Sequence, residues 1–198
     1  MSQLPKPLSN YVSRFNEQYG HLKLADINNE QLIELMTSQK AAVNNLFMAG
    51  AHVAHDCDIG NNCVLANNVM IAGHVQIGDW AILGGLSAVH QWTRIGSHSF
   101  LGGFSALTKD LIPYGLAVGN RATLEGLNLT GLRRRNFNNE EIKKVKRAYS
   151  VLFENDENEF NDRIEKLKSE NIKSSVVEEL ISFITQKGSR SYCLPKVS

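Results

Sequence analysis

The sequence lacks the features that mark several large classes of protein. Its 21 lysines and arginines barely exceed its 20 aspartates and glutamates, so no strong electric field favours nucleic acid as a partner. No apolar run approaches the roughly 18 residues of a membrane span, and the N-terminus has no signal-peptide pattern. We therefore expect a soluble, cytoplasmic protein without a membrane span.

Cysteines and aromatic residues are also scarce. The three cysteines, Cys57, Cys63 and Cys193, are odd in number and form no CxxC motif, which argues against a disulfide framework and against a zinc site. Aromatic residues make up only 8% of the chain, whereas there are 15 glycines. This balance suggests many turns, few bulky core residues and no cofactor.

A six-residue repeat dominates the middle of the chain. A glycine follows several of the apolar anchor positions of this repeat, and a small residue, such as Cys57 or Cys63, often stands two positions before them. An α-helix has 3.6 residues per turn, so it cannot keep one face apolar at a period of six. The anchors are Phe47, Val53, Ile59, Leu65, Ile71, Ile77, Leu83, Val89, Ile95, Leu101 and Leu107.

The repeat predicts a mainly β fold, a left-handed parallel β-helix of three to four coils over residues 44–112. In such a solenoid each hexad forms one short strand and one turn, and three hexads form a triangular coil. The anchors point inward and stack on those of the next coil, about 4.8 Å away. We expect the glycines to occupy tight turns that need a positive φ.

The C-terminal part of the sequence changes character. Residues 138–198 have apolar residues at helical spacing and are predicted to form a C-terminal helical domain, with Asn138 or Asn139 as the first N-cap. The tail from Ser189 onward is predicted to be loose. Residues 113–137 are interpreted as a connecting loop.

The first part of the chain, residues 1–43, has no hexads. Two short helices are predicted within it, at 10–19 and 29–40. The end coil of a β-helix exposes apolar side chains and open strand edges, which need a cover. The segment is therefore either a helical cap for the solenoid or a poorly ordered leader.

Histidines recur in the repeat at spacings close to one coil. His55 and His74 are 19 residues apart, and His90 follows 16 residues later. Coils of three hexads place His74 beside His55 and place His90 in the next coil. His52 and His90 directly flank anchors and therefore face outward. The clustering favours a functional ridge over a solvated polar face.

Imidazole suits general base catalysis near neutral pH. A histidine beside a carboxylate can take a proton from an attacking hydroxyl, and a backbone N–H at the Gly73 turn can hold an oxyanion. Zinc binding is the alternative, although Asp56 and Asp58 are the only carboxylates nearby in the sequence. The basic run 133–135 fits either a solvated patch or a pyrophosphate site.

Between about Asn44 and Tyr149 the chain carries a set of specific motifs: AHVAHDC, GNNCVLANN, AGHV, GGxxAVHQ, IGxHxxxGG, GNRAT and NxxGLxRRxF. In these motifs it closely resembles the acyl-carrier-protein–UDP-N-acetylglucosamine O-acyltransferases of lipid A biosynthesis. The resemblance implies transfer of an (R)-3-hydroxyacyl group from acyl carrier protein to the 3-hydroxyl of UDP-N-acetylglucosamine, the first step of that biosynthesis. It also implies a homotrimer with active sites between subunits.

The resemblance implies roles for individual residues. His55 falls at the general-base position, Asp56 would orient or stabilise its imidazolium, and Gly73 matches the oxyanion donor. Gly103 matches the position that limits acyl-chain length. The positions that hold the substrate are matched by His52, His74, His90 and Gln91. The positions around the nucleotide and its phosphates are matched by Asn128, Arg134 and Arg135.

Two other functions remain open at this point. Members of this family carry further coils before the AHVAHDC motif, where this sequence has 43 residues without hexads. One alternative is therefore a non-catalytic β-helix remnant that acts as a trimerising or binding module. The other is a nucleotide-sugar acyltransferase with a different acyl donor.

Overall fold

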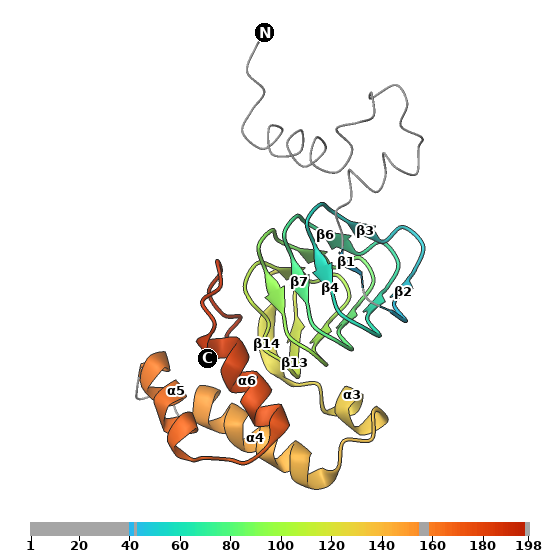
Figure 1. Cartoon of the computed structure of the whole chain (residues 1–198). Coiled ribbons are helices and arrows are strands. Elements are labelled where there is room, and N and C mark those ends of the chain that lie inside the picture. Colours follow the sequence, from blue (N-terminus) through green and yellow to red (C-terminus); the bar gives the residue numbers. More distant parts are fainter. Residues whose placement is uncertain (1–39, 42, 155–158, 197–198) are drawn as a thin grey trace, which may run out of the picture. The chain divides into compact units, whose positions relative to one another are not determined.

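Two-residue parallel strands recur every six residues along the solenoid (Figure 1). The computed structural model describes residues 40–41, 43–154 and 159–196. These residues lie in one compact unit, Gln39–Ser198. The strands are β1 (Lys40–Ala41), β2 (Leu46–Phe47), β3 (His52–Val53), β4 (Asp58–Ile59), β5 (Val64–Leu65), β6 (Met70–Ile71), β7 (Gln76–Ile77), β8 (Ile82–Leu83), β9 (Ala88–Val89), β10 (Arg94–Ile95), β11 (Phe100–Leu101) and β12 (Ala106–Leu107).

Each strand pairs in parallel with the strand one coil away, as Leu65 does with Phe47 and with Leu83. The strands form sheet A (β1-β4-β7-β10), sheet C (β12-β9-β6-β3) and sheet B. Sheet B also contains β13 (Gly115–Val118) and β14 (Thr123–Leu127), in the order β14-β13-β11-β8-β5-β2. The predicted parallel β-helix is thus confirmed. Because β1 pairs with β4, Lys40 lies in a strand and not at the end of the helix predicted over 29–40. The rest of that helix and the one at 10–19 lie outside the described residues.

The interior of the coils is filled as the repeat predicts. All anchors from Ile59 to Leu107 are buried, and so are the small residues before them, including Cys57 and Cys63. The first anchor, Phe47, is 43% exposed, because β2 pairs only with β5 within the described chain. Burial of stacked apolar side chains therefore stabilises every coil except the first, whose anchors are only partly covered.

The turns use a left-handed backbone position that is seldom a glycine. Every sixth residue from Asn44 to Phe104 has a φ between 56° and 74°, and only Gly50 among them lacks a side chain. For bulky residues such as Trp80 and Leu86, this conformation costs about 1–2 kcal/mol each. Because strand pairing imposes the same turn at each corner, side chains at this position form columns along the solenoid.

The glycines that follow the anchors do not supply this positive φ, so that prediction is wrong. They lie instead where a side chain would strike the next coil. A Cβ on Gly84 would lie 2.4 Å from the Gly103 nitrogen, and one on Gly96 would lie 2.2 Å from the Pro113 nitrogen. Close stacking of backbone on backbone is what requires them. The glycines without a positive φ are Gly60, Gly78, Gly84, Gly96 and Gly102.

Substitution of Gly84 by alanine tests this explanation. Because the added methyl group meets backbone atoms that cannot rotate away, Gly84→Ala should lower the free energy of unfolding by about 1–3 kcal/mol. The neighbouring Gly85 is a matched control, since a Cβ there meets only the Asn67 carbonyl oxygen at 3.3 Å. Urea unfolding should show a clear loss of unfolding free energy for Gly84→Ala and little change for Gly85→Ala. Equal losses would contradict the stacking explanation.

Residues 113–137 are not the connecting loop that the sequence suggested. β13 (Gly115–Val118) extends sheet B by pairing in parallel with β11, and β14 (Thr123–Leu127) returns antiparallel to it. The short helix α3 (Leu129–Arg134) follows directly. These elements close the last coil. They were missed because the hexad pattern ends before them and each is only four to six residues long.

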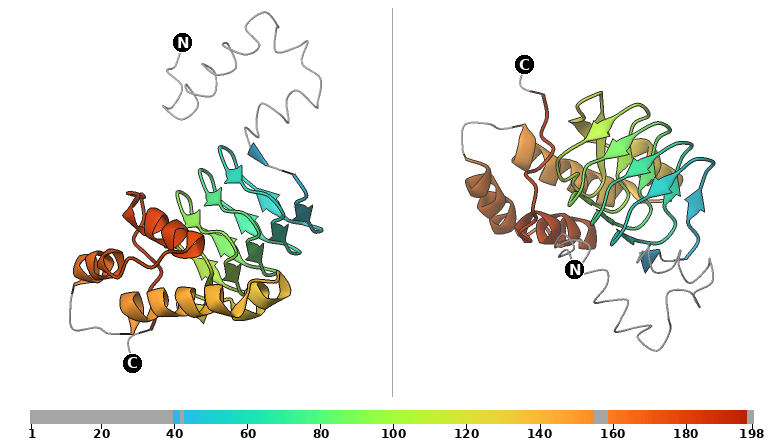
Figure 2. Two further views of the ribbon diagram at one scale, coloured as in Figure 1. Left: turned by 60° about the horizontal axis from the view of Figure 1, so that its bottom comes forward. Right: turned by 90° about the horizontal axis from the view of Figure 1, so that it is seen from above.

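Helices lie where the sequence predicts a C-terminal helical domain, over residues 138–198. α4 (Asn139–Phe153) starts from Asn138, which forms a capping box with Glu141. α5 (Phe160–Ser169) and α6 (Ser175–Thr185) pack with α4 through apolar faces. Figure 2 shows α4 and α6 beside the later coils of the solenoid. Among the described residues, no helix is long and apolar enough to cross a membrane.

The tail is ordered against the solenoid, so its predicted looseness is wrong for the described residues up to 196. Tyr192 forms a parallel bridge with Asp110, and Cys193 is fully buried and donates its N–H to the Asp110 carbonyl oxygen. Asp110 is itself buried and forms an ion pair with Arg94 at 2.7 Å. Backbone pairing with a buried, charged residue fixes the tail. No periodic pattern in the tail could have indicated this.

Candidate active site

The turns that lead from sheet C to sheet A stack into one column, which we call the histidine corner. His74 donates its N–H to the His55 carbonyl oxygen at 3.0 Å, and Trp92 donates to the Gly73 carbonyl oxygen at 3.1 Å. Residues of successive turns are therefore held directly over one another. The histidine corner consists of residues 54–57, 72–75 and 90–93.

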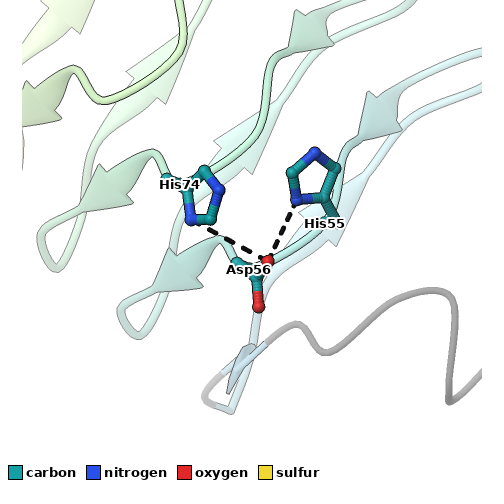
Figure 3. A group of neighbouring side chains, drawn as sticks. All are labelled: His55, Asp56 and His74. Carbon is teal, nitrogen blue, oxygen red and sulfur yellow. Dashed lines mark hydrogen bonds and ion pairs between the residues drawn. The ribbon is translucent and has the colours of Figure 1, made fainter. Parts of the chain in front are cut away.

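Asp56 joins two histidines of the histidine corner (Figure 3). Its Oδ2 lies 3.0 Å from His55 Nδ1 and 3.8 Å from His74 Nδ1. The two imidazole rings meet edge to face, with centroids 4.9 Å apart. The side chain of His55 is 41% exposed and that of Asp56 only 16%. The predicted contact between His55 and His74 is confirmed.

Asp56 occupies the left-handed corner position, at φ 58°. Aspartate tolerates this conformation better than most residues. The turn therefore points its carboxylate at both imidazoles. A carboxylate on Nδ1 leaves Nε2 of His55 as the outward nitrogen, which is the arrangement of an oriented general base.

The third predicted histidine, His90, lies in the next coil but not over His74. That place belongs to Trp92, whose ring stacks on His74 at 3.9 Å between centroids. His90 directly follows β9, and its N–H donates to the Leu107 carbonyl oxygen. His52, on β3, is exposed like His90, as the alternation of the strand predicts. The rings of the histidine corner therefore follow one another in the order His55, His74 and Trp92.

Gly73 packs against the ring of His55. A Cβ at this glycine would lie 2.6 Å from His55 Cε1 and 2.7 Å from Nε2, so any side chain would displace the imidazole. Among the described residues, the buried N–H of Gly73 donates to no hydrogen-bond acceptor. An unpaired donor beside the base can stabilise an oxyanion.

A metal-binding site is the other possible role of His55, Asp56 and His74. The ligand atoms of His55, Asp56 and His74 lie within 4.8 Å of one another. However, two ligands on one tetrahedral zinc ion are about 3.4 Å apart, whereas the Asp56–His74 pair is at 3.8 Å and the Asp56–His55 pair at the 3.0 Å of a hydrogen bond. The geometry favours a hydrogen-bonded group over an ion.

The remaining sequence-predicted residues lie away from the histidine corner of their own chain. Gly103 is exposed in the turn between β11 and β12, which joins sheets B and C. Asn128 caps α3: its Oδ1 accepts from Gly131 N at 3.0 Å and its Nδ2 donates to the His98 carbonyl oxygen at 2.9 Å. Arg134 is exposed on α3, and Arg135 follows it.

An aromatic column supports α3. His98 lies between Trp80 and Tyr114, with near-parallel rings at 6.2 and 5.7 Å. Phe137 meets His98 edge to face at 4.9 Å. Arg135 lies over the Trp80 ring at 5.3 Å and donates to the Trp80 carbonyl oxygen at 2.8 Å. Stacking at this corner therefore positions the basic end of α3.

Burial lowers the pKa of His98 to about 4, and the positive charge of Arg135 adds to this effect. The folded state therefore favours neutral His98. Above the ordinary histidine pKa of about 6.5, the imidazole is neutral in both states and its contribution is fully present. As the pH falls from about 6.5 to 4, the unfolded chain takes up a proton that the folded chain does not, so stability is lost.

The matching prediction compares pH profiles of stability. Between pH 6.5 and 4 the wild type should lose about 1–3 kcal/mol that a His98→Asn variant does not lose. Asparagine tolerates the positive φ of this position. His52→Asn is the control, since it removes an exposed imidazole. Urea unfolding at several pH values measures the difference, and identical profiles for wild type and His98→Asn would refute it.

Two family models match the chain. Residues 110–193 match the model described as UDP N-acetylglucosamine O-acyltransferase, domain 2. Residues 44–73 match the model of the bacterial transferase hexapeptide repeat. The first match covers the last coil, α3, the helices and the docked tail, and the second covers the turns that carry His55 and Gly73.

Two similar curated proteins carry the name acyl-[acyl-carrier-protein]–UDP-N-acetylglucosamine O-acyltransferase. The protein from Sinorhizobium medicae is 46% identical over 152 residues, which cover 77% of this chain and 56% of the relative. The protein from Burkholderia lata is 51% identical over 111 residues, which cover 56% of this chain and 42% of the relative. The chain thus spans about half the length of these curated relatives.

Solved structures of proteins with similar names resemble this chain as well. The UDP-N-acetylglucosamine acyltransferase from Campylobacter jejuni superposes with a TM-score of 0.72 at 38% identity, covering 77% of this chain and 59% of that one. The UDP-N-acetylglucosamine O-acyltransferase from Moraxella catarrhalis gives 0.74 at 37% identity, with 78% and 60% covered.

The fold and its turns define a left-handed parallel β-helix built from hexapeptide repeats, and the predicted fold class is confirmed. The chain is similar to the acyl-carrier-protein–UDP-N-acetylglucosamine O-acyltransferases, as its motifs indicated.

Proposed function

We propose that this protein transfers an (R)-3-hydroxyacyl group from acyl carrier protein to the 3-hydroxyl of UDP-N-acetylglucosamine, the first step of lipid A biosynthesis. The observation that carries the proposal is the His55–Asp56 pair beside the free N–H of Gly73, in a chain related to enzymes of that name. A base and an oxyanion donor on adjacent coils are the two elements that acyl transfer from a thioester requires.

The proposed reaction assigns one role to each of these groups. Nε2 of His55 takes the proton of the sugar hydroxyl as its oxygen attacks the thioester carbonyl carbon. Asp56, at 3.0 Å from Nδ1, holds the ring and stabilises the imidazolium that forms. The Gly73 N–H stabilises the tetrahedral oxyanion. As the carbon–sulfur bond breaks, the imidazolium returns the proton to the leaving thiolate of the carrier.

The exposed side chains around this pair are the proposed contacts to the substrates. His52, His74, His90 and Gln91 surround the sugar and its attached groups. Gly103, exposed and without a side chain, leaves space for a long acyl chain. Arg134 and Arg135, placed by the Asn128 cap, bind the nucleotide phosphates. Because α3 lies at a different corner of its own chain, we propose that a neighbouring subunit supplies it, in a homotrimer.

A non-catalytic module is the second candidate. The chain spans 56% and 42% of the two relatives described above, so surface that those enzymes use can lie outside it. A trimerising or binding module would keep the stacked core and exposed apolar side chains such as Leu86 and Phe104 without turning over substrate. Activity measurements separate the two candidates.

His55 is the residue whose removal tests catalysis. Purified protein with UDP-N-acetylglucosamine and 3-hydroxyacyl carrier protein should give acylated sugar nucleotide, detected by mass spectrometry. His55→Ala should lower kcat by at least about a hundredfold, because general base catalysis contributes about 10²–10⁴-fold. Gln76→Ala, which changes an exposed residue of β7, is the control and should keep full activity. No product from the wild type at high enzyme concentration would favour the non-catalytic module.

The apolar column at the corner between sheets B and C tests the trimer. Leu86 is 51% exposed and Phe104, directly over it, is 75% exposed, while Met70 on sheet C is 50% exposed. Such exposure on adjacent elements marks an interaction surface. Light scattering should give three times the 22.0 kDa mass of the chain. Phe104→Asp should shift the mass to that of the monomer, and a wild-type monomer would contradict a shared site.

A further inference from the structure

The docked tail brings an arginine to the histidine corner. Nη2 of Arg190 lies 2.8 Å from His90 Nδ1, and Nε donates to the Gln91 carbonyl oxygen at 3.1 Å. These residues are about 100 positions apart in the chain. Sequence reasoning had no signal for this contact, because the tail was expected to be loose.

Arg190 is a cation without a carboxylate partner among the described residues. Two other arginines are neutralised, Arg94 by Asp110 at 2.7 Å and Arg147 by Glu170 at 2.6 Å. Arg190 instead contacts one imidazole nitrogen and one carbonyl oxygen. Its positive charge is therefore free to attract an anion.

An open pocket of about 320 Å³ adjoins the guanidinium, and Trp92, Ser189 and Arg190 line it. Trp92, which lines this pocket, also stacks on His74. His55, His74 and Trp92 lie in successive coils, each about 4.8 Å from the next. The pocket is thus roughly 10 Å from the base, within reach of a group some bonds away from a reacting hydroxyl or thioester.

Arg190 also influences which ring nitrogen of His90 can donate a hydrogen bond to a ligand. His90 Nδ1 has two neighbours, Arg190 Nη2 at 2.8 Å and the Gln91 carbonyl oxygen at 3.2 Å. Guanidinium only donates hydrogen bonds, and its contact is the shorter and charged one, so we take Nδ1 as its acceptor. In the neutral imidazole the proton then lies on Nε2, which becomes a donor. A charged fork, a hydroxyl and an imidazole N–H are the donors that bind phosphate oxygens.

We propose that Arg190, Ser189 and His90 form a phosphate-binding subsite that extends the histidine corner beyond Trp92. The proposal rests on the proposed function, whose two substrates both carry phosphate: the diphosphate of the sugar nucleotide and the prosthetic arm of the carrier protein. Arg190 acts here as a binding residue, because the pocket is too far from His55 for contact with the reacting atoms.

The subsite is preorganised by the rest of the tail. Tyr192 and Cys193, two and three residues beyond Arg190, are held by backbone pairing with Asp110. The Tyr192 hydroxyl also donates to the Ile184 carbonyl oxygen at 2.8 Å. Arg190 therefore loses little freedom when it binds an anion, which favours affinity.

The test measures binding by the full chain with isothermal titration calorimetry. The probes are UDP-N-acetylglucosamine, holo acyl carrier protein and inorganic pyrophosphate. Arg190→Gln should weaken binding of pyrophosphate and of one substrate by about tenfold to a hundredfold, as expected for loss of a charged hydrogen bond. Arg190→Lys keeps the charge but not the fork, and should lie between. Lys187→Gln removes an exposed charge from the same tail and should change nothing.

The outcomes separate this proposal from the proposed function. Weaker binding of the sugar nucleotide alone assigns the phosphate to the nucleotide, and weaker binding of the carrier alone assigns it to the prosthetic arm. In steady-state assays the KM of that substrate should rise with kcat nearly unchanged. The protein could also bind pyrophosphate through Arg190 and yet show no acyltransferase activity. That result would support the phosphate-binding subsite and contradict the proposed enzymatic function. Equal affinities for wild type and Arg190→Gln, or no binding of any probe, would overturn the subsite.

The weaker binding of Arg190→Gln is informative only if the variant keeps the wild-type fold. The amide of Cys193, whose hydrogen bond to Asp110 reports the docked tail, should keep its NMR chemical shift and its protection from hydrogen exchange in Arg190→Gln. If that protection is lost, the Arg190→Lys variant decides the case. An affinity of Arg190→Lys equal to that of the wild type, with the tail docked, would refute recognition by the guanidinium fork.

Discussion

Stacking of one coil on the next is the interaction on which the rest of this structure depends. Backbone hydrogen bonds join residues one coil apart, as from His52 N to the Val69 carbonyl oxygen at 2.8 Å. The coils approach so closely that glycines such as Gly84 cannot carry a side chain. Because each turn repeats the one before it, side chains at equivalent positions align. The His55–Asp56–His74 group is a product of this alignment.

The features that could be predicted from the sequence are those set by its six-residue repeat. A period of six identified the strands, the inward anchors and the coil, and the coil length alone placed His74 beside His55. The helix cap at Asn138 was predictable because its signal is local. The same reasoning gave the glycines the wrong role, since the need for clearance between coils is not visible within one hexad.

Other parts of the site depend on contacts that no short pattern encodes. The side chain of Asn128 is fully used in capping α3 and in holding the His98 carbonyl oxygen, so its role within one chain is to support the helix. The place over His74 belongs to Trp92, although the next histidine along the chain is His90. Arg190 meets its partners only because Tyr192 and Cys193 pair with Asp110.

The docking of the tail has a consequence for the order in which parts of the site form. The turns that carry His55 and His74 leave the ribosome more than a hundred residues before Arg190. The base can therefore be in place before the cation that contacts His90 arrives. A chain cut between α6 and Ser189 would keep the His55–Asp56 pair and lose the Arg190 side chain.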